Sequence, residues 1–307
     1  MATQLFDPTV LGKNYEPDLA KYEALGKKAG LKPASSDKFR RILLLVDPQR
    51  DFVHTDGALS VPGAIGDVQR IIEYIYRNAE NITSIAASLD THVRMSIFHP
   101  MWWKNMETGL NPDPFTPITL ADIIAGKWLA VNEPKWSIHY VDQLEKAAKK
   151  NLMIWPYHCL VGTDGQKLVP ALAEAIAWHA AARSTKPVFI TKGTDPRVEH
   201  YGIFGAEVPD PKNAASLLNV TALDMVASFD EIDEAGEAFS HCVNETMKQE
   251  LRYFSSQPDV IKKIHFMLDC TSSVAHPTID FQALAMAELK DMEKQGVVVV
   301  KSTDPIK

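Results

Sequence analysis

Three residues with nucleophile or proton-transfer chemistry each lie close to the end of a short apolar run. Asp47 ends the run in LLLVDPQRDF, Lys192 follows PVFIT, and Cys242 lies in GEAFSHCVNET where a helical pattern begins. A lysine favours a neighbouring thiolate, and free N–H groups at a helix start stabilise a thiolate or an oxyanion. The alternatives are a turn cap for Asp47, a surface ion pair for Lys192 and a buried apolar contact for Cys242.

Four further residues have the types that bind metal ions. Asp90 and His92 in SLDTH project to the same side of an extended chain, His99 follows in FHP, and His158 lies in WPYHCLVGT. Together they predict a mixed nitrogen and oxygen site suited to zinc, iron or manganese. On spacing alone, unrelated polar loop residues are the favoured interpretation of this group.

Alternating apolar runs and helical patterns predict the elements that position these residues. Strands are expected at 41–46, 82–89, 187–191, 231–238, 264–268 and 297–301. Helices are expected at 65–78, 141–150, 168–182, 241–254 and 280–295, with a short one at 18–28. Apolar strands separated by helices indicate a parallel sheet covered on both faces. Because ligands bind beyond the carboxyl ends of such strands, Asp47, Lys192 and Cys242 are expected on one rim.

The chain is expected to divide into an N-terminal extension, 1–39, and one large domain, 40–307. A stretch at about 100–140, rich in tryptophan and proline, interrupts the alternation of strands and helices. A long aromatic insertion of this kind is typically a lid, a pocket wall or an oligomer contact. We therefore expect it to lie over the pocket, and we expect a homo-oligomer.

Composition limits the classes of partner. The 307 residues include 32 basic and 39 acidic side chains, a net charge of −7, which disfavours broad nucleic-acid binding. The sparse count of three cysteines argues against a disulfide framework, and the longest apolar runs are too short to span a membrane. A cytoplasmic protein that acts on a small molecule, with no membrane partner, is expected.

Six segments in order resemble the isochorismatase-like cysteine hydrolases, and most closely their nicotinamidase/pyrazinamidase-type members. They are LLLVDPQRDFVHTDGALSVPGA, SLDTH, WPYHCLVGTDGQKL, KGTDPRVEHYGIF, GEAFSHCVNET and LDCTSSV, spread over roughly 40–305. Six ordered blocks are more specific than any single motif. The resemblance implies a Rossmann-like, three-layer α/β/α sandwich with a central, mainly parallel six-stranded sheet.

The resemblance also implies an activity, the hydrolysis of a small carboxamide to its acid and ammonia through a thioester. It makes Cys242 the nucleophile, Asp47 the general base and later acid, and Lys192 the residue that holds the thiolate. The backbone N–H groups of Ala238 and Cys242 would form the oxyanion hole. A non-proline cis peptide would precede the nucleophile, around Glu237–Ala238.

The same resemblance implies a substrate site and a divalent metal. Phe52 and Trp155 would sandwich a flat substrate ring, with Tyr201 as a further contact. The implied metal ligands, which would fix a pyridine-type ring nitrogen, are Asp90, His92 and His158. The family pattern has its next histidine six residues after the first, whereas His99 comes seven residues after His92, so its role as a ligand stays open. His139, within the insertion, is an outside candidate for a replacement ligand.

Other interpretations stay open beside this one. The same three catalytic residues could act on another small amide, a carbamoyl compound or a ureido compound. A non-catalytic family member that serves as a binding module is a different class of protein. Phe239-Ser240 stands where the family more often has Thr-Asp, and the insertion leaves the substrate least certain of all. A dinucleotide-binding protein is disfavoured because no Gly-x-Gly-x-x-Gly follows the first strand.

Overall fold

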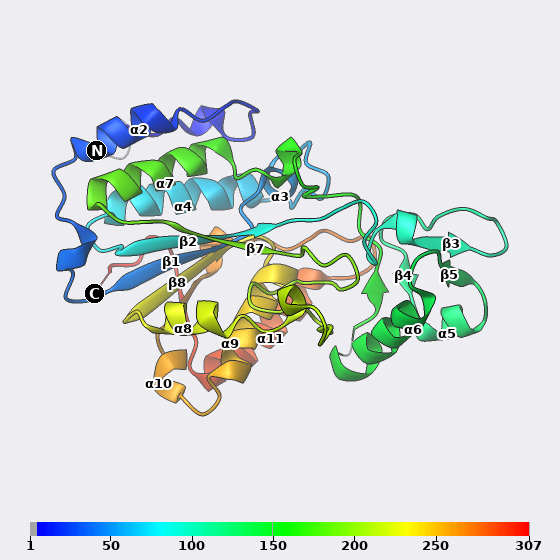
Figure 1. Cartoon of the computed structure of the whole chain (residues 1–307). Helices are drawn as coiled ribbons and strands as arrows, with labels where there is room; N and C mark the ends of the chain where they lie inside the picture. The colour runs from blue at the N-terminus through cyan, green and yellow to red at the C-terminus, as the bar shows by residue number, and fades with distance from the viewer. Residues whose placement is uncertain (1–4, 149, 307) are drawn as a thin grey trace.

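A six-stranded, fully parallel sheet forms the centre of the protein in the computed structural model, which describes residues 5–148 and 150–306 (Figure 1). Its strand order is β10-β9-β8-β1-β2-β7, and every neighbouring pair runs in the same direction. The strands are β1 (Arg41–Val46), β2 (Ser84–Asp90), β7 (Val188–Lys192), β8 (Glu231–Gly236), β9 (Ile264–Met267) and β10 (Val298–Val300). The predicted α/β sandwich with a parallel six-stranded sheet is confirmed.

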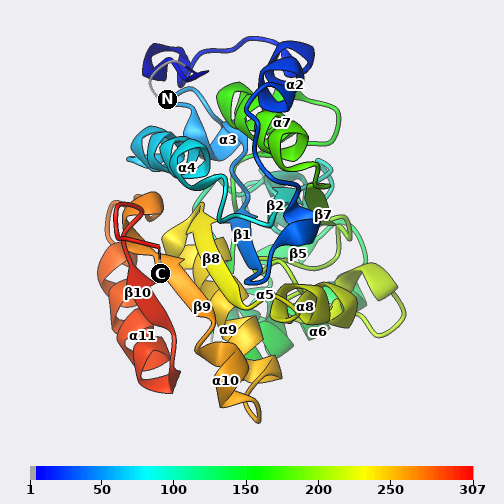
Figure 2. The same ribbon diagram turned by 90° about the vertical axis from the view of Figure 1, so that its left-hand side faces the viewer.

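Helices cover both faces of this sheet (Figure 2). One face carries α4 (Ala64–Asn78) and α7 (Pro170–Arg183), and the other carries α8 (Val220–Ala227), α9 (Asn244–Tyr253) and α11 (Phe281–Gln295). Alternate residues of β1 enter the two cores. Leu43 and Leu45 belong to the first hydrophobic cluster, and Ile42, Leu44 and Val46 to the second. This period of two explains why β1 is apolar at every position from Ile42 to Val46.

Most predicted helices are found, with two differences. The predicted helix 141–150 is wrong in its bounds, because α6 (Pro134–Gln143) starts earlier and passes into one π-helical turn, Leu144–Ala148. Pro134 occupies the first turn of α6, where its missing N–H costs no hydrogen bond. The sequence also gave no indication of α8. The remaining short helices are α3 (Arg50–Val53), α5 (Leu120–Ile124) and α10 (Pro258–Ile261).

The N-terminal segment packs on the outside of one helical layer. Its helix α2 (Leu19–Lys27) lies along α7 (Figure 1). The two helices approach closely at Gly26, where an added Cβ would stand 2.3 Å from the backbone oxygen of Trp178. Tyr15 donates a hydrogen bond to Oε2 of Glu174 on α7 at 3.0 Å. A glycine contact and a buried carboxylate therefore fix this segment to the domain.

The insertion forms a projection at the right of Figure 1, and its buried side chains belong to the first hydrophobic cluster. It contains two two-stranded antiparallel sheets, β3 (Trp103–Asn105) with β5 (Trp128–Ala130), and β4 (Pro117–Ile118) with β6 (Leu152–Met153). The indole N–H of Trp102 donates to Ser137 Oγ at 2.9 Å, and that of Trp103 to the Ile97 carbonyl at 2.6 Å. Its tryptophans therefore serve internal packing. Among the described residues, no helix is both long and apolar enough to cross a bilayer.

Candidate active site

Asp47 stands directly after β1, with its side chain fully enclosed. Its backbone is left-handed, with φ of 43°, a conformation that aspartate tolerates better than most residues. Its N–H donates to Ser88 Oγ at 2.9 Å, and the Ser88 hydroxyl donates back to Asp47 Oδ1. Ser88 lies on the neighbouring strand β2, so the pairing of β1 with β2 fixes the direction of the carboxylate.

Lys192, at the end of β7, is the centre of the buried charges. Its Nζ atom lies 2.9 Å from Asp47 Oδ2 and 3.0 Å from Asp90 Oδ1, and it donates to the His200 carbonyl at 2.8 Å. Burial opposes the charge on Lys192, but the two carboxylates outweigh it and hold the pKa of Lys192 well above its ordinary value. Lys192 is therefore a permanent cation between two anions.

Cys242 completes the predicted group of three. It lies in a π-helical turn, Phe239–Val243, which connects the end of β8 to α9. Its Sγ is 3.7 Å from the Nζ atom of Lys192, and no hydrogen bond joins it to His241 among the described contacts. The structure thus brings Asp47, Lys192 and Cys242 together from the ends of three strands.

The protonation state of Cys242 depends on several opposing influences. Lys192 lowers the pKa of the Cys242 thiol, as expected. Burial nevertheless raises that pKa well above its ordinary value, and Asp47 and Asp90 also raise it. Burial also raises the pKa of Asp47, against the influence of Lys192. Cys242 is therefore a neutral thiol at rest, and Asp47 is a stronger base than an exposed aspartate.

The turn before Cys242 contains the predicted cis peptide bond. The peptide bond between Glu237 and Ala238 is cis, as expected. Nearby N–H groups are committed to backbone carbonyls, that of Phe239 to Ser272 and those of His241 and Val243 to Ala238. The predicted oxyanion donors, Ala238 and Cys242, are not among these committed groups.

Asp90, His92 and His158 form a compact cluster beside Lys192. One ligand atom from each lies within 4.8 Å of the others, and His92 Nε2 is 2.7 Å from Asp90 Oδ2. The Nδ1 atoms of both histidines face backbone carbonyls, His92 that of Gly193 at 3.1 Å and His158 that of Pro156 at 2.7 Å. A carbonyl only accepts, so Nδ1 carries the hydrogen and Nε2 offers a lone pair. This donor set fits a divalent metal ion.

His99 lies beside this cluster but outside it. Its ring centroid is 5.8 Å from that of His92 and 5.6 Å from that of His158. Its Nδ1 faces the Val93 carbonyl at 3.0 Å, and its Nε2 has no hydrogen-bond partner within the described part of the chain. Burial lowers the pKa of His99 to about 2, so the ring is neutral. The His99 ring therefore carries its hydrogen on Nδ1, as a metal-bound histidine would. His99 is nevertheless not one of the three residues of the cluster. The other candidate, His139, is exposed and lies near Trp136, away from the cluster.

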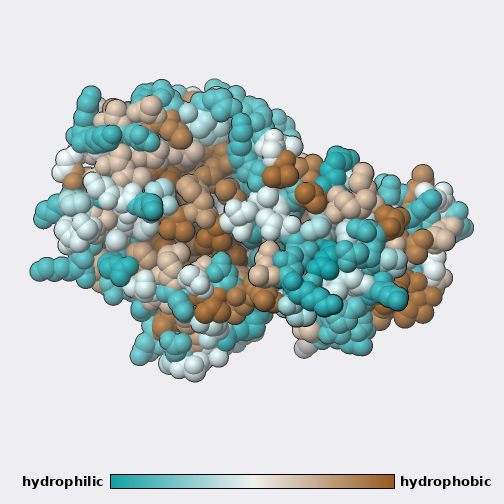
Figure 3. Space-filling model, in the orientation of Figure 1, coloured by the Kyte–Doolittle hydropathy of each residue, from teal (hydrophilic) through white to brown (hydrophobic). Residues whose placement is uncertain are grey.

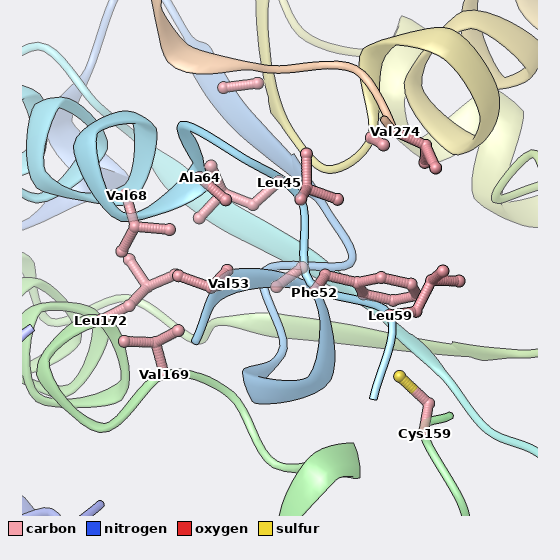
Figure 4. Packing of buried hydrophobic residues seen from close by; sticks show 14 of the residues in the cluster. Leu45, Phe52, Val53, Leu59, Ala64, Val68, Cys159, Val169, Leu172 and Val274 are labelled. Carbon is pink, nitrogen blue, oxygen red and sulfur yellow. The ribbon is translucent and has the colours of Figure 1, made fainter. Parts of the chain in front are cut away.

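A cavity joins the thiol to the cluster of Asp90, His92 and His158. Phe52 is held by α3, and Figure 4 shows its ring beside Leu59 at the edge of the packed core. The three predicted substrate contacts, Phe52, Trp155 and Tyr201, all line this cavity. The complete lining is Phe52, Leu59, Asp90, His92, Phe98, Trp155, His158, Glu199, His200, Tyr201, Ala238, His241, Cys242 and Val274.

The cavity corrects one expectation and adds residues that sequence reasoning missed. No residue of 100–140 lines it, so the insertion lies beside the pocket rather than over it. The insertion contacts the outside of the wall, where Phe115 packs against Trp155 with ring centroids 5.8 Å apart. Glu199, His200 and Phe98 were missed as lining residues. Glu199 and His200 stand immediately before Tyr201, so the block KGTDPRVEHYGIF contained the signal.

Comparison with known proteins identifies the fold. Neither protein-family models nor curated sequences give a match. The structure is similar to yeast nicotinamidase bound to the inhibitor nicotinaldehyde, with 18% identity, a TM-score of 0.57, and coverage of 85% of this chain and 99% of that one. It is similar to the Acinetobacter baumanii nicotinamidase/pyrazinamidase at 18% identity and a TM-score of 0.55, covering 88% and 99% of the two chains. This chain therefore has the isochorismatase-like α/β fold of the nicotinamidases.

Proposed function

We propose that the protein is a cysteine-dependent amidohydrolase that hydrolyses a small, aromatic carboxamide to its acid and ammonia, as a nicotinamidase does. The observation that supports this most strongly is the buried arrangement in which Lys192 contacts Asp47 at 2.9 Å and Cys242 at 3.7 Å. The similar structures are a nicotinamidase with nicotinaldehyde and a nicotinamidase/pyrazinamidase. The cavity beside the thiol has aromatic walls suited to a flat ring.

The proposed reaction begins with proton transfer from the Cys242 thiol to Asp47. The thiolate attacks the amide carbon, and the N–H groups of Ala238 and Cys242 receive the oxyanion. The C–N bond then breaks, and Asp47 returns the proton to nitrogen. Ammonia departs, and the acyl group remains bound to Cys242 as a thioester. Asp47 next takes a proton from water, whose hydroxide attacks the thioester carbon. The C–S bond breaks, the acid is released and the thiol is restored.

Lys192 makes this proton transfer possible without itself titrating. In the resting state its charge stabilises ionised Asp47, and after transfer it stabilises the thiolate at 3.7 Å. The negative charge thus moves from one neighbour of Lys192 to another. Because all three groups are buried, little solvent reorganisation accompanies the step.

Substrate orientation would depend on the walls of the cavity and on the metal-binding cluster. Phe52 and Trp155 would hold the ring, and Tyr201 would close the same wall. Asp90, His92 and His158 would hold a divalent ion of zinc, iron or manganese. When bound, such an ion supplies a Lewis-acid contact for a ring nitrogen.

Ammonia release from nicotinamide tests this proposal, with elemental analysis of the same preparation. We expect wild-type activity and loss of at least about 10³-fold in Cys242→Ala, since the thiol forms the covalent intermediate. Cys270→Ala is the matched control, because Cys270 is also a buried free thiol but does not line the cavity. Full activity in Cys242→Ala would show that Cys242 is not the nucleophile.

A panel of amides separates the alternatives. If only a carbamoyl or ureido compound is turned over, the proposed roles of the three catalytic residues stand and the proposed substrate is wrong. A pure binding module would bind amides and release no ammonia. We also propose that the protein works in the cytoplasm, which the three free, buried cysteines support.

A further inference from the structure

Glu199 is a buried acid in the wall of the cavity that the proposed mechanism does not use. Its side chain lines the cavity together with Cys242, and only 4% of the residue is exposed. The indole N–H of Trp155 donates to its Oε1 atom at 2.6 Å. Its Oε2 atom has no hydrogen-bond partner among the described residues. One oxygen of this carboxyl group is therefore committed to the wall, and the other is free for a ligand.

The hydrogen bond from Trp155 also decides where a proton on Glu199 must lie. An indole N–H only donates, so Oε1 must present a lone pair to it. The proton of a neutral Glu199 therefore belongs to Oε2, which becomes an unsatisfied donor. Burial raises the pKa of Glu199 to about 8, so the acid is neutral at physiological pH.

Hydrogen bonds from Tyr201 and Trp155 lower the pKa of Glu199, but they offset its burial only in part. Tyr140 on α6 accepts the Glu199 backbone N–H at 2.8 Å, and burial raises the pKa of both Tyr140 and Tyr201, so both phenols are neutral. The remaining charges are Glu207, which raises the pKa of Glu199, and Lys150, which lowers it. These two form an ion pair at 3.1 Å, so their effects oppose one another.

We propose that Glu199 determines substrate choice, because its Oε2–H donates a hydrogen bond to a neutral amide that carries a second hydrogen-bond acceptor. The inference rests on the proposed amidohydrolase function and defines its substrate class. A ring carbonyl oxygen, or a second ring nitrogen beside the one that the metal ion would contact, would satisfy the donor. A substrate with an anionic ring substituent would be rejected once Glu199 ionises. An amide without a second acceptor would leave the buried Oε2–H donor unpaired.

The pH dependence of KM for pyrazinamide, whose ring has a second nitrogen, gives the first test, with wild type and Glu199→Gln compared. Glutamine reproduces the neutral acid, since its oxygen accepts from Trp155 and its amide nitrogen donates in place of Oε2–H. We expect the wild-type KM to be flat at low pH and to rise as pH passes about 8. The KM of Glu199→Gln should stay flat over the same range, while kcat keeps the wild-type pH profile.

A second variant, Glu199→Leu, removes the donor altogether. We expect its KM at pH 6.5 to rise about tenfold with kcat nearly unchanged, and its metal content to equal that of wild type. Glu174→Gln is the control, because Glu174 is also buried but lies outside the cavity lining. A pH-independent wild-type KM, or an unchanged KM in Glu199→Leu, would overturn the inference while leaving the hydrolase intact. Absence of any wild-type amide hydrolysis would instead refute the proposed function, and the inference with it.

Discussion

The Nζ atom of Lys192 lies 2.9 Å from Oδ2 of Asp47, and neither side chain has any exposure to solvent. Each group carries a charge that the protein interior would otherwise penalise, and each supplies the counter-charge of the other. The pair also borders the thiol of Cys242, so the same contact serves both the stability of the fold and the proposed chemistry. Predictions that separate these two roles follow from it.

Lys192→Met should abolish activity and destabilise the fold. Methionine keeps the shape of the stem but leaves Asp47 and Asp90 as buried anions without their shared cation. We expect the free energy of unfolding at pH 7 to fall by about 3–5 kcal/mol. Asp47→Asn in the same background should recover part of that loss and none of the activity. Denaturant unfolding and ammonia release measure the two effects, and unchanged stability in Lys192→Met would contradict the pairing.

Metal content should distinguish the clustered ligands from His99. We expect His158→Ala to lose most of its bound ion, because His158 is one of three ligands within 4.8 Å of one another. His99→Ala should retain the ion with an affinity lowered by about 10- to 100-fold, the usual effect of a residue that supports a site. Chelator competition followed by elemental analysis measures both. Equal loss from the two variants would place His99 among the direct ligands.

A buried pair of acids should make the fold sensitive to alkali. Glu234 on β8 and Glu250 on α9 are fully enclosed, and each is the hydrogen-bond partner of the other. Burial raises the pKa of Glu234 to about 6 and that of Glu250 well above its ordinary value. Carboxyl groups with raised folded-state pKa values give stability that is complete below the unfolded pKa and is lost as pH rises through the folded one.

Glu250→Gln should therefore raise the free energy of unfolding more at pH 8 than at pH 4.5. We expect the two changes to differ by about 2 kcal/mol. The comparison is made by denaturant unfolding of wild type and variant at the two pH values. Glu288→Gln on α11 provides a control, since Glu288 is an exposed glutamate that should show no such pH dependence. A larger gain at the lower pH would show that the sign is wrong.

The insertion is where we expect copies of the chain to associate. It exposes large apolar side chains, among them Met106, Leu110, Ile124 and Leu129. Brown, apolar atoms are visible at the right-hand end of the molecule in Figure 3. Exposed apolar side chains are typical of contact surfaces. We expect wild type to sediment as an oligomer and the double variant Leu110→Asp/Ile124→Asp to sediment at lower mass with its activity retained. A wild-type protein that sediments as a monomer would contradict this prediction.

The amino-acid sequence by itself determined the parallel sheet and the catalytic candidates. Runs such as Ile42–Val46 are apolar at every position because both faces of the strand are buried, and that local pattern predicts a covered parallel strand. The end of such a strand can be read from the chain, so Asp47 and Lys192 could be assigned to one rim. The six ordered segments likewise placed Cys242 beside them.

Only the tertiary structure decided properties that depend on groups distant in sequence. The pKa of Cys242 is set by burial together with Lys192, Asp47 and Asp90. The burial of the thiol depends on residues that are distant in the sequence, so it cannot be read from the local sequence. Glu199 gained its significance in the same way, because its free oxygen is defined by the cavity and by Trp155, 44 positions away.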